Sequence, residues 1–246
     1  MSRARKSAGR RIDALAHWLL RFRVISAPAR WIANSTIAWS VISRTDRIRR
    51  NRLRDRIKAA GPEMMPRHIS MIMDGNRRFA WNRSINTDAG HAAGKKRLKD
   101  VMRWILDLEI PYLTVYALST ENLTSREGEE LDTLFDLYVS GLEEISTDPL
   151  VHENRVKVQV VGRTDLLPDH VRKAIAEAEE ATSQYSDFLF TVCLAYGGRE
   201  EIVDAVKTIA ADHAAGDLDI DSIDPAAISS RLYTADLPDP DLVIRT

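Results

Sequence analysis

From residue 66 to the end of the chain, short apolar runs alternate with longer segments in which apolar residues recur every three or four positions. The strand-like runs cover residues 68–73, 112–118, 155–161, 188–195 and 241–245. The first helical pattern between them is carried by Leu98, Val101, Met102, Ile105 and Leu108. Alternation of this kind predicts an α/β fold with a mostly parallel central sheet flanked by helices.

The remaining helical patterns and two strand positions refine this expectation. Helices are expected over 129–145, 168–181, 199–214 and 225–232. The run from Arg155 to Val160 alternates apolar and polar residues, which is typical of a strand near a sheet edge. Val243 and Ile244 show no such alternation, and this predicts a central strand that is covered on both faces.

The first 60 residues differ in charge from the rest. Residues 1–60 hold sixteen Lys and Arg against three Asp and Glu, whereas residues 61–246 carry nineteen against thirty-three. We therefore divide the chain into a basic, helical N-terminal extension, 1–60, and a main domain, 61–246, with the boundary at Gly61-Pro62. The stretch from Arg44 to Lys58 is expected to be a very basic helix with a thin apolar edge formed by Ile48, Leu53 and Ile57.

Three tryptophans stand among the basic residues of the extension. Trp18, Trp31 and Trp39 lie in apolar patches that are shorter than the ~20 residues needed to span a bilayer. Tryptophans flanked by Arg suit an interfacial helix on an anionic membrane. A disordered tail and a helix packed on the main domain remain open alternatives. No nucleic-acid-binding module accompanies the charge, so no nucleic-acid partner is expected. The single cysteine, Cys193, lies in an apolar run and is interpreted as a core residue in a reducing compartment.

Polar motifs follow the carboxyl ends of all five predicted strands. They are Asp74-Gly75-Asn76, Ser119-Thr120-Glu121-Asn122, Gly162-Arg163, Gly197-Gly198-Arg199 and Arg245. Ligands of open α/β sheets bind at this edge, so these motifs are expected to converge on one site.

The first of these motifs has the composition of a phosphate site. A short apolar strand ends in Asp74, a Gly75-Asn76 turn and the paired Arg77 and Arg78. A carboxylate can hold Mg²⁺, and guanidinium groups can grip phosphate through two hydrogen bonds. The alternative is an ordinary strand–turn–helix joint with a solvated basic helix start. No Gly-Lys-Ser/Thr loop, no G-x-G-x-x-G and no zinc-type Cys/His set occurs.

Five segments, in order, resemble motifs of the cis-prenyltransferase family, which includes undecaprenyl and dehydrodolichyl diphosphate synthases. The similarity runs from about Pro66 to the last residue. The segments are His68 to Ala80 (HISMIMDGNRRFA), Gly90 to Gly94 (GHAAG), Tyr116 to Asn122 (YALSTEN), Ala195 to Arg199 (AYGGR) and Asp241 to Thr246 (DLVIRT).

The resemblance implies a reaction and roles for particular residues. An allylic diphosphate loses its diphosphate while the double bond of isopentenyl diphosphate attacks C1, with Mg²⁺ as cofactor on Asp74. Apolar side chains of the 91–109 and 129–145 helices would line a tunnel for the product, or would simply form core. A homodimer at the cytoplasmic membrane face is also implied. The implied catalytic residues are Asp74, Asn76, Ser119 and Asn122, and the implied substrate-binding residues are Gly75, Arg77, Arg78, Phe79, His91, Glu121, Leu123, Arg126 and Arg245.

The chain departs from the family pattern in several places. Thr87 stands where an Arg is usual, Leu123 stands where an aromatic residue is common, and Arg126 is displaced by one position. The family also continues beyond the point at which this chain ends, with further diphosphate-binding residues. We therefore expect residues 1–246 to be a fragment that is inactive and poorly soluble by itself. The alternative function is a non-catalytic partner subunit that binds a catalytic homologue.

Overall fold

The computed structural model describes residues 48–49, 51–125 and 128–246. The chain forms two compact units, Met1–Pro62 and Glu63–Thr246. In the first unit, residues 48–49 and 51–58 are helical, and the predicted apolar edge of this helix is exposed, with Ile48 at 49% and Leu53 at 45%. The three tryptophans of the predicted membrane contact lie outside the described residues.

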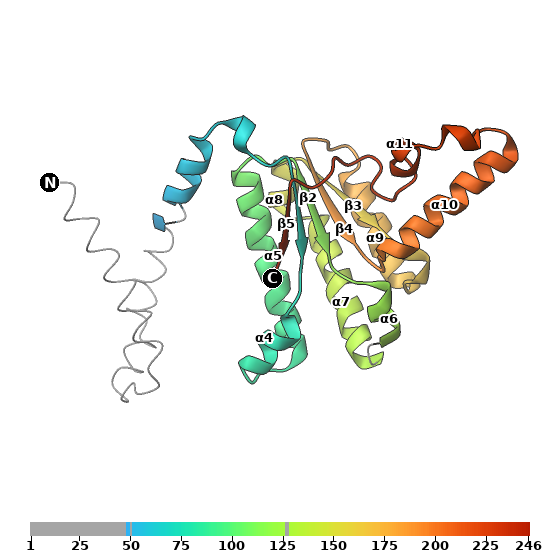
Figure 1. The fold of residues 1–246 in the computed structure, drawn as a ribbon. Coiled ribbons are helices and arrows are strands. Elements are labelled where there is room, and N and C mark those ends of the chain that lie inside the picture. The colour runs from blue at the N-terminus through green and yellow to red at the C-terminus, as the bar shows by residue number, and fades with distance from the viewer. Residues whose placement is uncertain (1–47, 50, 126–127) are drawn as a thin grey trace, which may run out of the picture. The chain divides into compact units, whose positions relative to one another are not determined.

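The second unit is built on a five-stranded sheet in which every neighbouring pair of strands is parallel. The order across the sheet is β3-β4-β2-β1-β5 (Figure 1). This architecture confirms the predicted α/β class. The strands are β1 His68–Ile72, β2 Tyr112–Tyr116, β3 Val156–Val161, β4 Phe188–Cys193 and β5 Leu242–Arg245.

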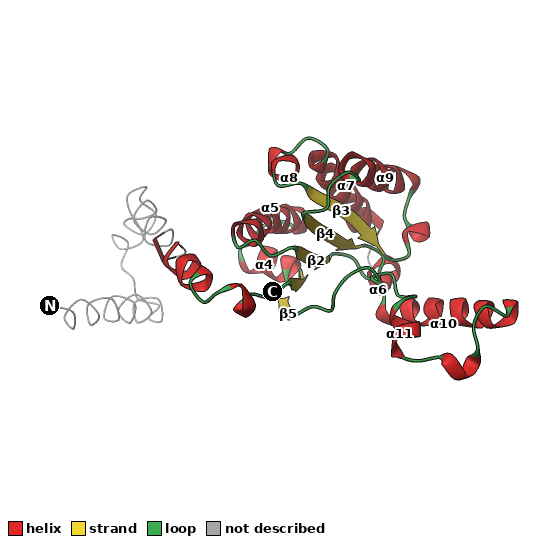
Figure 2. Ribbon diagram, turned by 90° about the horizontal axis from the view of Figure 1, so that it is seen from above, coloured by secondary structure: helices red, strands yellow, loops and turns green. Residues whose placement is uncertain are grey.

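Helices connect the strands, and those that follow β1, β2 and β3 cover one face of the sheet. Figure 2 shows α5, α7 and α9 on one face and α10 on the other. The α-helices are α4 Asn76–Asn82, α5 Thr87–Asp107, α6 Thr120–Ser125, α7 Gly128–Ile145, α8 Pro149–Glu153, α9 Asp169–Thr182, α10 Gly198–Ala215 and α11 Pro225–Ser229. Three short 3₁₀ helices are η1 Pro62–Met64, η2 Thr164–Leu166 and η3 Ile220–Ser222. No helix within the described residues is long and apolar enough to cross a membrane.

The sheet edges agree with one prediction and correct another. β3 lies at an edge, as its alternating residues indicated. β5 was expected to be central, but it lies at the other edge, where it pairs with β1 and leaves Val243 60% exposed. An apolar strand without alternation therefore indicates burial only where another element covers it, and within the described residues no strand pairs with the outer side of β5.

The main apolar core lies between the sheet and α5. Its buried members include Val115 of β2, Phe190 of β4 and Ile105 of α5. The opposite face of the sheet holds buried polar groups. There His68 bonds Thr114 Oγ1 at 2.8 Å and the Pro238 carbonyl at 2.6 Å. Cys193 is buried as predicted, and burial raises the pKa of its thiol to about 12.

Candidate active site

The turn after β1 sets the first residues of the site. Gly75 adopts φ 96°, in the left-handed region that favours glycine, and it caps the N-terminus of α4. This conformation turns the chain sharply between Asp74 and the first helical residue, Asn76. A strand–turn–helix joint is therefore present, and it also places a carboxylate, an amide and two guanidinium groups side by side.

Asp74 is held by a residue that lies 171 positions later in the chain. Because β5 is parallel to β1 with Ile72 opposite Arg245, Arg245 lies beside Asp74. Its Nε and Nη2 atoms are 3.2 and 2.8 Å from Asp74 Oδ2, and Arg78 Nη2 is 3.4 Å from the same oxygen. The hydrogen bond from Arg245 is the main cause that lowers the pKa of Asp74 below its ordinary value.

The glycine pair of the Gly90-His91-Ala92-Ala93-Gly94 segment has a packing function that the sequence did not show. A Cβ atom at Gly94 would lie 2.8 Å from Asn76 Oδ1 and 2.9 Å from its Nδ2. Only a residue without a side chain lets α5 come this close to Asn76. Gly94 therefore leaves the space in which the Asn76 amide lies.

His91 lies on α5, one turn before Lys95. It is 5% exposed, and its Nε2 atom is 3.5 Å from Glu130 Oε1 on α7. Arg77 Nε is 3.8 Å from the same Glu130 oxygen. Glu130 thus links α4, α5 and α7 at the site. It was not predicted, because an acidic residue in the first turn of a helix is usually read as a response to the helix dipole.

The end of β2 supplies the next group of residues. Ser119 Oγ accepts a hydrogen bond from the Asn122 backbone N–H at 3.0 Å, so it stabilises the start of α6. Tyr116, which was not predicted, donates its hydroxyl proton to the Tyr196 carbonyl at 3.1 Å. Burial of the Tyr116 phenol raises its pKa.

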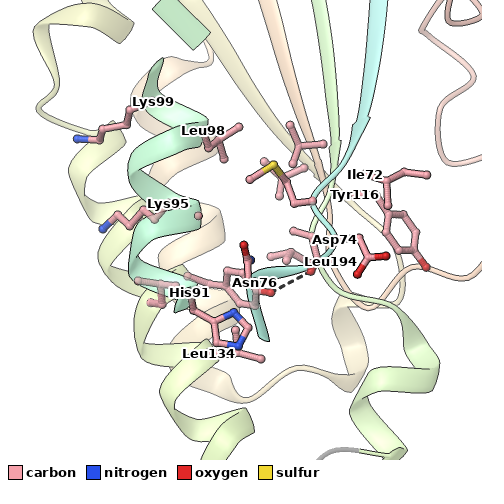
Figure 3. A pocket seen from close by; sticks show the side chains of 18 of the residues that line it. Ile72, Asp74, Asn76, His91, Lys95, Leu98, Lys99, Tyr116, Leu134 and Leu194 are labelled. Atoms are coloured by element: carbon pink, nitrogen blue, oxygen red, sulfur yellow. Dashed lines mark hydrogen bonds between the residues drawn. The ribbon is translucent and has the colours of Figure 1, made fainter. Parts of the chain in front are cut away.

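These residues surround the mouth of a cavity of about 660 Å³ that extends between the sheet and helices α5 and α7. Figure 3 shows Asp74 and Asn76 near Tyr116 at the ends of the strands, with His91 on α5 facing them. Deeper in the cavity the lining is mostly apolar and comes from Leu98, Met102, Val115, Leu134, Leu137, Leu142, Phe190, Val192 and Leu194. The cavity therefore has a polar mouth and an apolar interior.

Ten of the predicted site residues line this cavity. They are Asp74, Gly75, Asn76, Arg77, Arg78, His91, Ser119, Glu121, Asn122 and Arg245. Phe79 does not line it; its ring lies under the Arg83 guanidinium at 4.7 Å and is 39% exposed. Leu123 packs instead against the apolar cluster beneath α7 and α9. Arg126 lies outside the described residues.

The motifs after β3 and β4 do not reach the cavity, so the expected convergence of all five is wrong in this respect. β3 and β4 follow β2 on the side of the sheet away from β1, and the cavity mouth lies around β1, β2 and β5. Arg163 instead pairs with Asp165 at 3.2 Å and with Asp204 at 3.8 Å. Position in the sheet, rather than presence at a strand end, decides which motif joins the site.

A magnesium ion fits the residues at the mouth. Mg²⁺ is usually bound through one or two carboxylates together with water and substrate phosphates. Asp74 provides one carboxylate, and Glu121 lines the same cavity. The described residues contain no group of three or more His, Cys, Asp or Glu that could hold a metal without a substrate. The donor set therefore fits an ion that arrives with a phosphate group.

The charges at the mouth define the kind of ligand. Arg77, Arg78 and Arg245 have side chains that are 58%, 71% and 69% exposed, so their guanidinium groups are accessible to an anion. Three such groups beside an apolar cavity suit a molecule with a diphosphate head and a long hydrocarbon tail. The fold and the site thus define an α/β protein for amphipathic phosphate esters.

Comparison with known proteins identifies the family. Residues 72–246 match the family model described as "Putative undecaprenyl diphosphate synthase". Tritrans,polycis-undecaprenyl-diphosphate synthase (geranylgeranyl-diphosphate specific) of Methanopyrus kandleri is 48% identical over 182 residues, which are 74% of this chain and 67% of that protein. The corresponding Pyrococcus horikoshii enzyme is 48% identical over 74% of this chain and 69% of its own length.

A solved structure shows the same fold. Lavandulyl diphosphate synthase from Lavandula x intermedia, in complex with dimethylallyl diphosphate, superposes with a TM-score of 0.70 at 34% identity. The superposition covers 73% of this chain and 77% of that one. The chain belongs to the cis-prenyltransferase, or undecaprenyl diphosphate synthase, family.

Proposed function

We propose that this protein condenses isopentenyl diphosphate with an allylic diphosphate to form a cis-polyprenyl diphosphate, with geranylgeranyl diphosphate as primer. The named relatives are described as geranylgeranyl-diphosphate specific, which supports this choice of primer. The observation that carries the proposal is the polar mouth, with three exposed guanidinium groups beside one carboxylate, opening on an apolar cavity.

In the proposed reaction, the double bond of isopentenyl diphosphate forms a bond to C1 of the allylic substrate. The C1–O bond breaks at the same centre, diphosphate leaves with its electron pair, and a proton is then lost from the new unit. Arg77 and Arg78 stabilise the negative charge that develops on the leaving group. When bound to Asp74, Mg²⁺ adds further charge neutralisation to the diphosphates.

The remaining residues position the reactants. Arg245 is proposed to bind isopentenyl diphosphate, and Ser119, Asn122 and Asn76 to orient it toward the allylic carbon. Asn76 is the first residue of α4, and its amide lies in the space that Gly94 leaves. The buried His91 is proposed to contact a diphosphate while Glu130 orients the ring. The apolar cavity excludes water from the growing chain.

The test is an incubation with radiolabelled isopentenyl diphosphate, geranylgeranyl diphosphate and Mg²⁺, with product length resolved by chromatography. It has two arms, the 246-residue chain and the protein expressed from its natural gene. For the first arm, we propose that the 246-residue chain by itself is inactive. Absence of chain elongation in the second arm, with dimethylallyl, geranyl and farnesyl diphosphate also tried, overturns the proposed function. Elongation only after addition of a catalytic homologue would favour the partner-subunit alternative.

We further propose a homodimer that attaches to the cytoplasmic face of the membrane through residues 1–60. The exposed edge strand β5, with Leu242 at 45% and Val243 at 60% exposure, supports an association of two copies. Sedimentation equilibrium tests the dimer, and a monomer at micromolar concentration contradicts it.

A further inference from the structure

Four charged side chains lie in the wall of the cavity, away from its polar mouth. Lys95 and Lys99 come from α5, Glu144 from α7, and Asp148 from the residue that caps α8. Lys95 Nζ is 2.7 Å from Glu144 Oε1, Lys99 Nζ is 2.6 Å from Glu144 Oε2, and Lys99 Nζ is 3.3 Å from Asp148 Oδ2. Together they form a chain of ion pairs that crosses from one helix to the other.

The packing around this cluster supports ion pairs between α5 and α7. A Cβ atom at Gly141 of α7 would meet the Lys95 Cε atom at 3.8 Å, so the lysine stem lies against the bare backbone of α7. The Lys95 ammonium also donates to Ser140 Oγ at 3.1 Å. Figure 3 shows Lys95 and Lys99 pointing away from Asp74 and Asn76. The cluster therefore does not belong to the diphosphate-binding mouth.

These ion pairs lie beside apolar side chains of the cavity. Leu98, Met102 and Ile145 line the cavity beside the charges. Charged groups next to apolar surface are tolerated when they are paired, and here two cations face two anions. The hydrogen bonds from Lys95 and Lys99 lower the pKa of Glu144.

The wall of the cavity is held differently at the α5–α7 seam and at the sheet. On the opposite side, the strands of the sheet are held to one another by main-chain hydrogen bonds. Within the described residues no main-chain hydrogen bond joins α5 to α7. Ion pairs among Lys95, Lys99, Glu144 and Asp148 cross the seam instead. Separating the helices would break these ion pairs, whereas the backbone hydrogen bonds of each element would remain.

We propose that Lys95, Lys99, Glu144 and Asp148 form an electrostatic latch on the α5–α7 seam, which limits the length of polyprenyl tail that the cavity holds. This inference rests on the proposed function, because the tail is that of its product. A tail that is too long for the cavity must separate α5 from α7, which breaks these ion pairs. Weakening the latch should therefore favour long tails over short ones.

The test measures binding of two probes, geranylgeranyl monophosphate and undecaprenyl monophosphate, to the protein expressed from its natural gene. Glu144→Gln removes both pairs made by Glu144, and Lys95→Met removes one. The matched control is Glu177→Gln, which removes the exposed Lys173–Glu177 pair of α9. Partly exposed pairs contribute up to about 1 kcal/mol each, roughly a five-fold change in affinity. We expect Glu144→Gln to shift the ratio of the two Kd values about three- to ten-fold toward the long probe, and Lys95→Met to shift it less.

Salt gives a second readout. Raising ionic strength should shift the same ratio toward the long probe in the unmodified protein, but should have little effect in Glu144→Gln, because its latch is already broken. A variant that is merely destabilised weakens both probes alike and leaves the ratio unchanged. In the condensation assay, Glu144→Gln should give longer products.

The outcomes separate the two proposals. Ratios and product lengths that are equal in Glu144→Gln and Glu177→Gln overturn the latch, even if condensation proceeds normally. Failure of both the unmodified protein and Glu144→Gln to bind undecaprenyl monophosphate also overturns it. Failure of condensation alone, with the expected shift in probe ratios, overturns the proposed function and leaves the latch as a property of a polyprenyl-binding cavity.

Discussion

Arg245 grips Asp74 from the neighbouring strand, with Nε at 3.2 Å and Nη2 at 2.8 Å from the same carboxylate oxygen. Both residues stand at the ends of parallel strands in register, and both side chains remain accessible, at 69% and 37% exposure. Without a ligand, the opposite charges of Arg245 and Asp74 therefore neutralise each other. A diphosphate that brings Mg²⁺ offers each residue an alternative partner, because the guanidinium can bind phosphate and the carboxylate can bind the metal.

Replacing Arg245 by Met should raise the pKa of Asp74 toward its ordinary value of 3.8, because the main hydrogen bond that lowers it is lost. A carboxyl group with a lowered pKa contributes stability that is present above that ordinary value and is lost as the pH falls through the folded-state pKa. The variant should therefore lose less stability on acidification than the parent. Carbon-13 NMR titration of the Asp74 carboxyl measures the shift. An unchanged titration would show that Arg78 and the backbone suffice.

The same Arg245→Met variant should bind isopentenyl diphosphate more weakly. Each charge-assisted phosphate contact contributes roughly 1.5–3 kcal/mol, or about ten- to a hundred-fold in affinity. We expect KM for isopentenyl diphosphate to rise by about that factor, with a smaller effect on the primer. Arg172→Met, at an exposed pair with Asp169 on α9, is the control. An equal rise for both substrates would contradict the assignment of Arg245.

Asp74→Asn should abolish turnover while the fold is kept, since the side chain retains its size and stands at a partly exposed turn. Loss of the carboxylate that we propose to hold Mg²⁺ should remove several kcal/mol of charge stabilisation, equivalent to about a thousand-fold or more in kcat. Asp100→Asn on α5, which removes a carboxylate paired with Arg97 and Arg103, should be nearly normal. Near-normal turnover of Asp74→Asn at saturating Mg²⁺ would remove this residue from the mechanism.

The sequence predicted the five strands, the longer helices and the sheet class because apolar periodicity reflects which faces are buried. It misplaced β5, since Val243 and Ile244 carry no information about which strand lies beside them. The parallel pairing of β5 with β1 is a feature of the tertiary structure, and this pairing brings Arg245 beside Asp74. Neighbours along the chain are easy to predict, whereas neighbours across the sheet depend on strand order.

The site residues divide in the same way. Motif residues after β1 and β2 gather at the cavity because these strands are adjacent. Glu130 and Tyr116 were missed, since their roles appear only when α7 and β4 are placed beside them. The sequence did contain one further indication of the cavity wall. Lys95 and Lys99 follow His91 at helical spacing, so all three residues lie on the face of α5 that lines the cavity.

Residues 1–60 should bind anionic membranes through their excess of Lys and Arg together with three tryptophans. Binding should fall steeply as salt rises, because surface attraction to anionic lipid is screened within a Debye length of ~10 Å at 0.1 M salt. Co-sedimentation with phosphatidylglycerol vesicles at several salt concentrations measures this. Vesicles of phosphatidylcholine alone provide the uncharged comparison. Equal binding by a chain that starts at Gly61 would refute the prediction.

Gly94→Ala should reduce turnover without weakening the fold. The new methyl group would lie 2.8 Å from Asn76 Oδ1, so the Asn76 amide must move out of its position at the cavity mouth. Alanine is favoured over glycine within a helix by about 1 kcal/mol, which offsets part of the crowding. We expect kcat to fall about ten- to a hundred-fold, as is typical when a positioned group is displaced by about 1 Å, while Tm changes little. Gly141→Ala on α7 is the matched control, because its Cβ meets only the Lys95 stem at 3.8 Å. A large fall in Tm for Gly94→Ala would instead mean that α5 itself has shifted, and that Gly94 serves packing rather than the position of Asn76.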